Sequence, residues 1–286
     1  MDNININVNL YSRQISTYGL ETMYKLINMN ILIYGLRGLG LEISKNIILS
    51  GVKKLSIFDE NKCNINDLSS NFYINEDDIP NKRRDEACLK KLSELNPYVT
   101  INKIETSKDF KNEIKNYDVI IITEIIEKEI LFEYNKLCRE NKKGFIYTSN
   151  LGLAGFLFVD FGDEHIIFNE IGNEPLTFYI KNISQENEGV ITIDNDNEHN
   201  LNNLKSHFVI FKNIKGMTEL NDKEPIKIKI LSKQSFSIGD TSNFQKYISG
   251  GIVKEIYIPF KIKFFSLEES FLNPFTDDTP GQSLNM

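Results

Sequence analysis

The stretch ILIYGLRGLGLEISKNIILSGVKKLSIFD, residues 31–59, decides the fold of this 286-residue chain. Residues 31–34 are a short apolar run of strand-forming side chains, and a glycine-rich turn follows at residues 35–40. Residues 41–49 have helical spacing, and residues 54–58 form a second strand that ends on an acid. This order of strand, turn, helix and strand predicts half of a Rossmann-type nucleotide-binding unit.

The glycine-rich turn departs from the usual phosphate-binding pattern at one position. In G-x-G-x-x-G the middle glycine lets the backbone approach a pyrophosphate, and here Arg37 stands at that position between Gly35 and Gly40, beside Gly38. A long side chain obstructs the approach, so the turn predicts the fold but a degenerate nucleotide site. Asp59 stands where dinucleotide enzymes bind a ribose hydroxyl, although an ion pair with Arg37 or a helix-capping role is at least as well supported.

The composition is typical of a soluble globular protein, with 41% hydrophobic and 26% charged residues. A net charge of −7 argues against a nucleic-acid partner. No apolar run approaches the roughly 20 residues that span a bilayer, and the first residues lack the regions of a signal peptide. We therefore expect a reducing intracellular compartment and no membrane partner.

The cysteines and histidines give no sign of a metal site or a nucleophile. Cys63, Cys88 and Cys138 have no CxxC spacing, and the three histidines are scattered. No histidine or motif that would lower a thiol pKa lies near any cysteine in the sequence. We favour structural roles for all three, and we expect Cys63, in a polar loop, to be the most exposed.

The predicted order of elements to about residue 150 is β-α-β-α-β-β-α-β, in which the third strand leads directly to the fourth. Helices are predicted at 86–95 and 130–140, and further strands at 99–104, 117–123 and 145–149. This order predicts an open α/β sheet with helices on both faces. The long polar loop at 60–85 is a candidate binding segment, and its charge run Lys82-Arg83-Arg84 is interpreted as a solvated face.

The pattern changes to short strands in the second half of the chain. Residues 155–161 and 165–168 predict a hairpin through residues 162–164. Strands predicted at 177–183, 190–193, 208–211, 226–231, 236–238 and 252–259 indicate a small β-barrel or sandwich. We divide the chain into a disordered leader at 1–9, an α/β domain at 10–173, a β-rich domain at 174–260, and a helical start or loose tail at 261–286.

Several segments together resemble the first half of a ubiquitin-activating enzyme. They are LYSRQ at 10–14, the stretch from 35 to 59, DLSSNFYINEDDI at 67–79, KLSELNPYV at 91–99, GMTELNDKEPIKIKIL at 216–231, FSIGDTSNF at 236–244 and YISGGIVKEIYIP at 247–259. The resemblance implies a Rossmann-like adenylation fold of the ThiF/MoeB type in an inactive copy. It also implies an inserted β-barrel, the first half of the family's catalytic-cysteine region. The adenylation domain would be incomplete, so we expect a large exposed hydrophobic face.

The resemblance implies the N-terminal part of an enzyme that adenylates the ubiquitin C-terminus with ATP and Mg²⁺ and then forms a cysteine thioester. An active turn carries glycine at the position of Arg37, and an active loop carries Asn-x-x-Arg-Gln-Phe where this chain has DLSSNF at 67–72. We therefore expect this chain to bind no nucleotide or metal, to lack the catalytic cysteine, and to be inactive alone. Arg13 alone reads as a surface arginine, but the resemblance implies that it reaches across a pseudo-dimer to the ATP γ-phosphate in an active domain.

The implied partners are the active adenylation domain of the same enzyme, ubiquitin, and a ubiquitin-conjugating enzyme that binds other domains. The implied location is cytoplasmic and nuclear. One alternative is the smaller subunit of an activating enzyme for another modifier such as SUMO, which shares the LYSRQ-like and GLRGLG-like stretches but lacks the β-rich segment. A second is an NAD(P)-dependent Rossmann oxidoreductase, against which Arg37 argues.

Overall fold

The chain forms two compact units, which we describe separately. The computed structural model describes residues 6–169, 172, 175–194, 201, 204 and 206–272. The first unit comprises Met1–His165 and Ile262–Met286, and the second comprises Ile166–Lys261. Within the described ranges, no helix is long and apolar enough to cross a membrane.

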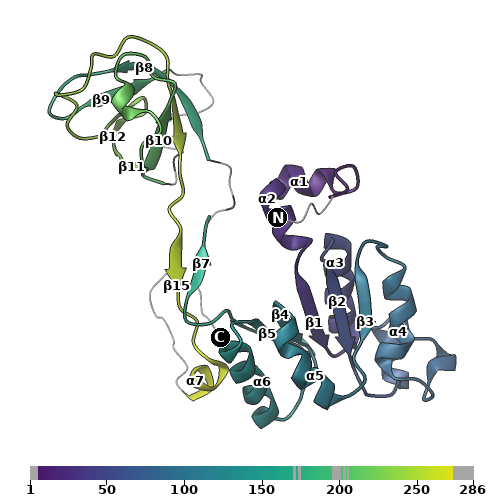
Figure 1. Ribbon diagram of the computed structural model, residues 1–286. Helices are drawn as coiled ribbons and strands as arrows, with labels where there is room; N and C mark the ends of the chain where they lie inside the picture. The colour runs from purple at the N-terminus through teal and green to yellow at the C-terminus, as the bar shows by residue number, and fades with distance from the viewer. Residues whose placement is uncertain are drawn as a thin grey trace. The chain divides into compact units, whose positions relative to one another are not determined.

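The first unit is built on a six-stranded sheet with the order β3-β2-β1-β4-β5-β6 (Figure 1). Strands β1 to β5 run parallel, and β6 lies antiparallel to β5 at one edge. This order reverses direction between β1 and β4, and open α/β sheets bind their ligands at such a switch point. The strands are β1 (Asn30–Tyr34), β2 (Lys54–Phe58), β3 (Thr100–Lys103), β4 (Val119–Ile122), β5 (Gly144–Leu151) and β6 (Ala154–Asp160).

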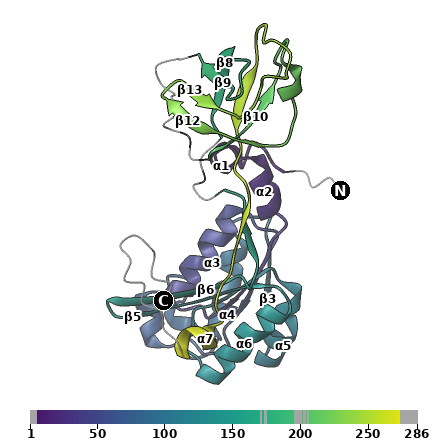
Figure 2. The ribbon, with the colours of Figure 1, turned by 90° about the vertical axis from the view of Figure 1, so that its left-hand side faces the viewer.

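Helices cover both faces of this sheet, as the sequence predicts (Figure 2). Because side chains alternate along a strand, Ile31 and Ile33 of β1 pack on one face with residues of α3 and α4. Leu32 and Tyr34 pack on the other face with residues of α5, α6 and α7. The helices are α3 (Gly38–Ser50), α4 (Arg84–Ser93), α5 (Ser107–Glu113), α6 (Lys128–Glu140) and α7 (Leu267–Leu272).

Two short helices, α1 (Ser12–Tyr18) and α2 (Leu20–Leu26), lie at the end of the sheet where β1 begins (Figure 1). They enclose a small cluster of Ile6, Tyr11 and Met23. Ile6 and the turn after it belong to the predicted leader, whose residues 1–5 lie outside the described residues. This cluster connects the start of the described chain to the helical pair.

Two predictions about the elements of the first unit are wrong. The sequence pattern passes directly from the third to the fourth strand, but α5 and a 3₁₀ turn at Ile114–Asn116 lie between them. The predicted hairpin at 155–168 is not formed, because β6 pairs instead with β5 in a register that joins Leu151 to Ala154. Gly152, with a φ of 60°, supplies the positive φ that this tight turn requires. Strand β7 (His165–Ile167) pairs with β15 (Phe260–Ile262) in a separate two-stranded sheet.

The second unit is a nearly closed, barrel-like antiparallel sheet of seven strands with the order β11-β10-β14-β8-β9-β13-β12. Its core includes Phe178, Ile191, Val209, Phe236 and Val253, all buried. The predicted β-rich architecture is confirmed, and two strands match their predicted ranges residue for residue. The strands are β8 (Thr177–Ile183), β9 (Val190–Ile193), β10 (Phe208–Lys212), β11 (Ile226–Lys227), β12 (Lys229–Ser232), β13 (Ser235–Ser237) and β14 (Ile252–Glu255).

Candidate functional site

The glycine-rich turn lies at the carboxyl end of β1, at the switch point of the sheet. Its glycines are required by close backbone packing. A Cβ at Gly40 would lie 2.0 Å from the carbonyl oxygen of Gly35, which itself has a φ of 99°. A Cβ at Gly38 would lie 2.7 Å from the Cβ of Ser70. Packing and backbone conformation therefore require glycine at Gly35, Gly38 and Gly40.

Arg37 occupies the position where a phosphate-binding turn needs its middle glycine. It is the N-cap of α3, and its guanidinium Nε lies 3.3 Å from Oε2 of Glu124, the second residue after β4. Glu124 is buried, and burial raises the pKa of its carboxyl group, whereas the charge of Arg37 lowers it. The ion pair joins the start of α3 to the segment after β4, on the two sides of the switch point between β1 and β4.

Asp59, at the tip of β2, is fully buried and both of its carboxylate oxygens are engaged. Oδ2 accepts a hydrogen bond from the backbone N–H of Leu36 at 2.8 Å, and Oδ1 accepts one from the backbone N–H of Asn61 at 3.1 Å. The ion pair of Asp59 is with Arg84, at 3.4 Å from Nη1, and the suggested pair with Arg37 is not formed. A ribose hydroxyl would have to displace these contacts.

Arg84 lies at the centre of a buried group of charges. Only 2% of its side chain is exposed, and its Nε donates to Oδ2 of Asp67 at 3.0 Å. Its Nη1 also lies 3.6 Å from Oε2 of Glu124. One guanidinium therefore contacts three carboxylates: Asp59 after β2, Asp67 in a 3₁₀ turn, and Glu124 after β4. We call Arg84, Asp59, Asp67 and Glu124 the Arg84 cluster.

The sequence interpretation of the run at residues 82–84 as a solvated face is therefore wrong for Arg84, although Lys82 is exposed. Arg84 is buried, and Arg83 pairs through Nη2 with the buried carboxylate of Asp85 at 2.5 Å. The sequence near Arg84 gives no sign of its burial, because the acids that neutralise it are 17 to 40 positions away. An acid at the tip of β2 is the one sequence signal that could have indicated a buried partner.

The segment between β2 and α4 is an ordered part of the first unit. Asn64 and Asp67 cap the 3₁₀ turn Ile65–Ser69 reciprocally, and a second 3₁₀ turn follows at Glu76–Asp78. Ile74 from this segment packs in the core beneath α3 and α4. Asn71 donates from Nδ2 to the carbonyl oxygen of Leu36 at 2.7 Å, which fixes the segment against the glycine-rich turn.

All three cysteines are buried, so Cys63, which the sequence predicts to be the most exposed of the three, is hardly more exposed than the other two. Its backbone N–H donates to the carbonyl oxygen of Lys82, which draws it into the core. Burial raises the pKa of Cys63 to about 11 and those of Cys88 and Cys138 to about 12. The thiolate is the nucleophilic form, so these thiols are poorly suited to catalysis near neutral pH.

Arg13 lies apart from the other predicted site residues. It is exposed on α1, and it forms no ion pair with any residue that the structure describes. The neighbouring Tyr11 contacts Gly51 at the C-terminal end of α3, whereas the glycine-rich turn is at the N-terminal end. Since α3 has 13 residues, it separates the two places by about 20 Å at a rise of about 1.5 Å per residue.

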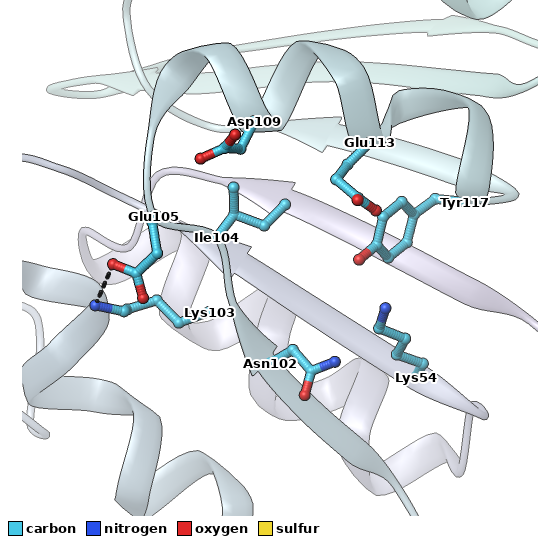
Figure 3. Close-up of a pocket in the computed structure, with 8 residues that line it drawn as sticks. All are labelled: Lys54, Asn102, Lys103, Ile104, Glu105, Asp109, Glu113 and Tyr117. Atoms are coloured by element: carbon cyan, nitrogen blue, oxygen red, sulfur yellow. Dashed lines mark ion pairs between the residues drawn. The ribbon is translucent and has the colours of Figure 1, made fainter.

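A separate hollow of about 300 Å³ lies beside β3 and α5 (Figure 3). In Figure 3 the side chain of Lys54 points toward the ring of Tyr117, 4.8 Å from its centroid, and Lys103 pairs with Glu105 at 2.9 Å. None of the predicted site residues lines this hollow. Among the described residues, no group of side chains has the composition of a metal site.

Comparison with known proteins matches both units. The model of the ThiF family matches residues 11–174, and the model of the ubiquitin-activating enzyme E1 FCCH domain matches residues 186–256. The ubiquitin-like modifier-activating enzyme 1 of Oryctolagus cuniculus is 39% identical over 269 residues, which are 94% of this chain and 25% of that protein. The Dictyostelium discoideum protein of the same name is 38% identical over 275 residues, covering 94% and 26%. Ubiquitin-activating enzyme E1 1 of Arabidopsis thaliana is 37% identical over 272 residues, covering 94% and 25%. The chain thus spans about a quarter of the length of these relatives.

Proposed function

Because this chain belongs to the ThiF family and corresponds to the N-terminal portion of a ubiquitin-activating enzyme, we propose that it is the scaffolding part of such an enzyme. The complete enzyme would adenylate the C-terminus of ubiquitin with ATP and Mg²⁺ and then form a cysteine thioester. This chain would pair with an active adenylation domain, form part of the surface that holds ubiquitin, and be inactive alone. The three buried cysteines support a nucleophile located elsewhere in the enzyme.

The Arg84 cluster carries this proposal. A nucleotide at the switch point needs an open turn and an acid that is free to bind the ribose. Here Arg37 spans the turn, and the carboxylate of Asp59 is fully buried and bonded to protein groups. These contacts support a site that holds no nucleotide and takes no part in the adenylation reaction.

The position of Arg13 supports a role toward a second domain. Its guanidinium is exposed and has no carboxylate partner among the described residues, so its charge is available. Its neighbour Tyr11 contacts the far end of α3, about 20 Å from this chain's own turn by the rise of that helix, which supports a phosphate that belongs to another domain. Arginine suits this task because its planar fork binds phosphate oxygens with two hydrogen bonds.

The test is ubiquitin-dependent exchange between ATP and pyrophosphate in the activating enzyme that contains this chain. Arg13→Ala should lower kcat by about 100-fold or more, the usual effect of removing one charge-stabilising donor, while helical circular dichroism stays unchanged. Arg13→Lys should restore only part of the rate, because an ammonium group cannot make the bidentate contact. Unchanged adenylation kinetics in Arg13→Ala would contradict the proposed role.

A further inference from the structure

The helix that carries Arg13 depends on the rest of the protein for its orientation. Helix α1 has 7 residues and none of them is buried. A helix this short is not stable alone in water, because the cost of forming its first turn is not recovered. Its position must therefore be set by contacts with the rest of the protein, and within the helix Ile15 is partly buried against the cluster that contains Tyr11.

The main contact is at Tyr11, the N-cap of α1 and two residues before Arg13. Only 5% of Tyr11 is exposed, and its hydroxyl oxygen accepts a hydrogen bond from Nδ2 of Asn96 at 3.0 Å. The same Nδ2 donates to the carbonyl oxygen of Ile48, in the last turn of α3, at 3.0 Å. Asn96 thereby connects the cap of α1 to the end of α3.

The ring of Tyr11 also requires a glycine beside it. Gly51 has a φ of 86°, and a Cβ there would lie 2.6 Å from the ring and hydroxyl oxygen of Tyr11. Gly162 has the same φ of 86° with nothing within 4 Å of a Cβ. Alanine at Gly162 carries only the backbone cost of a side chain at positive φ, whereas alanine at Gly51 also displaces the ring of Tyr11. Comparing the two substitutions therefore isolates the effect of the ring.

We propose that Tyr11, Asn96 and Gly51 are positioning residues that hold Arg13 in the orientation needed to reach a phosphate on the partner domain. This inference rests on the proposed function, because it assigns these residues an effect on catalysis that acts through Arg13. Asn96 and Gly51 both contact the ring or hydroxyl of Tyr11. The guanidinium of Arg13, in contrast, forms no ion pair in the described part of the chain. A buried anchor at Tyr11 and an exposed guanidinium without an ion pair suit a side chain that is oriented before it meets its phosphate.

The structural half is tested on this chain alone by hydrogen exchange followed by mass spectrometry. Tyr11→Phe deletes the hydroxyl and its hydrogen bond, and should speed exchange across Ser12–Tyr18 by about fivefold to tenfold. Gly51→Ala should do the same, whereas Gly162→Ala should leave α1 unchanged. Unaltered exchange in both Tyr11→Phe and Gly51→Ala would overturn the inference.

The catalytic half is tested by pyrophosphate exchange in the enzyme that contains this chain. Gly51→Ala should lower kcat with little change in KM for ubiquitin, and should have no further effect in an Arg13→Ala background. A further loss in that background would show a merely structural role and overturn the inference. If Arg13→Ala alone has no effect, the proposed role of Arg13 is wrong, and Tyr11 has no positioning role in catalysis. Faster hydrogen exchange of α1 in Tyr11→Phe would then show that Tyr11 only anchors the helix.

Discussion

Removing the guanidinium of Arg84 should strongly destabilise the first unit. Arg84→Ala leaves the carboxylates of Asp59, Asp67 and Glu124 buried without the charge that contacts all three. Deleting one partner of a buried ion pair typically costs about 3–5 kcal/mol, which is a large part of the stability of an ordinary domain. Arg84→Lys keeps the charge but loses the planar fork, so its free energy of unfolding should fall between those of Arg84→Ala and the parent chain.

The assay is urea unfolding followed by helical circular dichroism. Every α-helix in the described ranges belongs to the first unit, so this signal reports that unit rather than the β-rich one. A matched control is Lys25→Ala, which breaks an exposed pair with Glu21 and should cost at most about 0.5 kcal/mol. A loss below about 1 kcal/mol for Arg84→Ala would mean that water reaches the carboxylates, and would refute the argument for a closed site.

The pH dependence gives a second reading of the same substitution. Burial raises the pKa of Glu124, and the charges of Arg37 and Arg84 lower it, so removing Arg84 should raise this pKa further. A group whose pKa is higher in the folded than in the unfolded state stabilises the fold below its unfolded pKa, and that contribution is lost as pH rises through the folded pKa. The stability deficit of Arg84→Ala should therefore be smaller at about pH 5 than at about pH 8.

Three further outcomes follow from the geometry. Gly40→Ala should lower the free energy of unfolding of the first unit by at least about 2 kcal/mol, because its Cβ would lie 2.0 Å from the Gly35 carbonyl oxygen. Gly155→Ala, whose Cβ would make only an ordinary 3.7 Å contact with Oδ1 of Asn150, is the control in thermal unfolding. Asn135→Ala deletes the side chain that accepts a hydrogen bond from the Leu267 N–H at 3.0 Å, so amides of α7 should exchange about fivefold faster, and unchanged exchange would show that packing alone holds this helix. Calorimetric titration of the chain with ATP-Mg²⁺ or NADH should show no saturable binding; saturation by ATP would contradict a closed site, and saturation by NADH would favour an oxidoreductase.

The parts of the fold that local sequence periodicity controls were predictable. The short apolar run at 31–34, the helical spacing at 41–49 and the strand at 54–58 identified β1, α3 and β2 within a few residues. Helix α5 was missed because it is short and polar, with Phe110 as its only buried residue. The pairing of β7 with β15 was missed because the two strands lie far apart in the sequence, and local pattern carries no information on such pairing.

The candidate site was predictable in outline and not in detail. The prediction of a degenerate turn rests on Arg37 at the glycine position and needs no tertiary information, because the steric requirement for glycine is local. The ion-pair partners in the site were not predictable. Glu124 pairs with Arg37 across three intervening strands of the chain. Arg84 pairs with Asp59 across the long segment between β2 and α4. A basic run such as residues 82–84 is interpreted as exposed to solvent whenever the acids that pair with it lie far away in the sequence.

The pairing of β7 with β15 has a thermodynamic consequence for the whole chain. It brings the two ends of an inserted segment of roughly 100 residues to about 5 Å, the spacing of neighbouring strands. While the β-rich unit is folded, its two ends are held together, so the chain of the α/β unit is interrupted only by the equivalent of a very short loop. When the β-rich unit unfolds, folding of the α/β unit must bring together the ends of a long flexible loop. Loop-closure entropy grows with the logarithm of length, so this difference amounts to about 3 kcal/mol. Folding of the insert thus supports folding of its host through chain entropy, and a lesion in the β-rich unit should lower the melting temperature of the α/β unit.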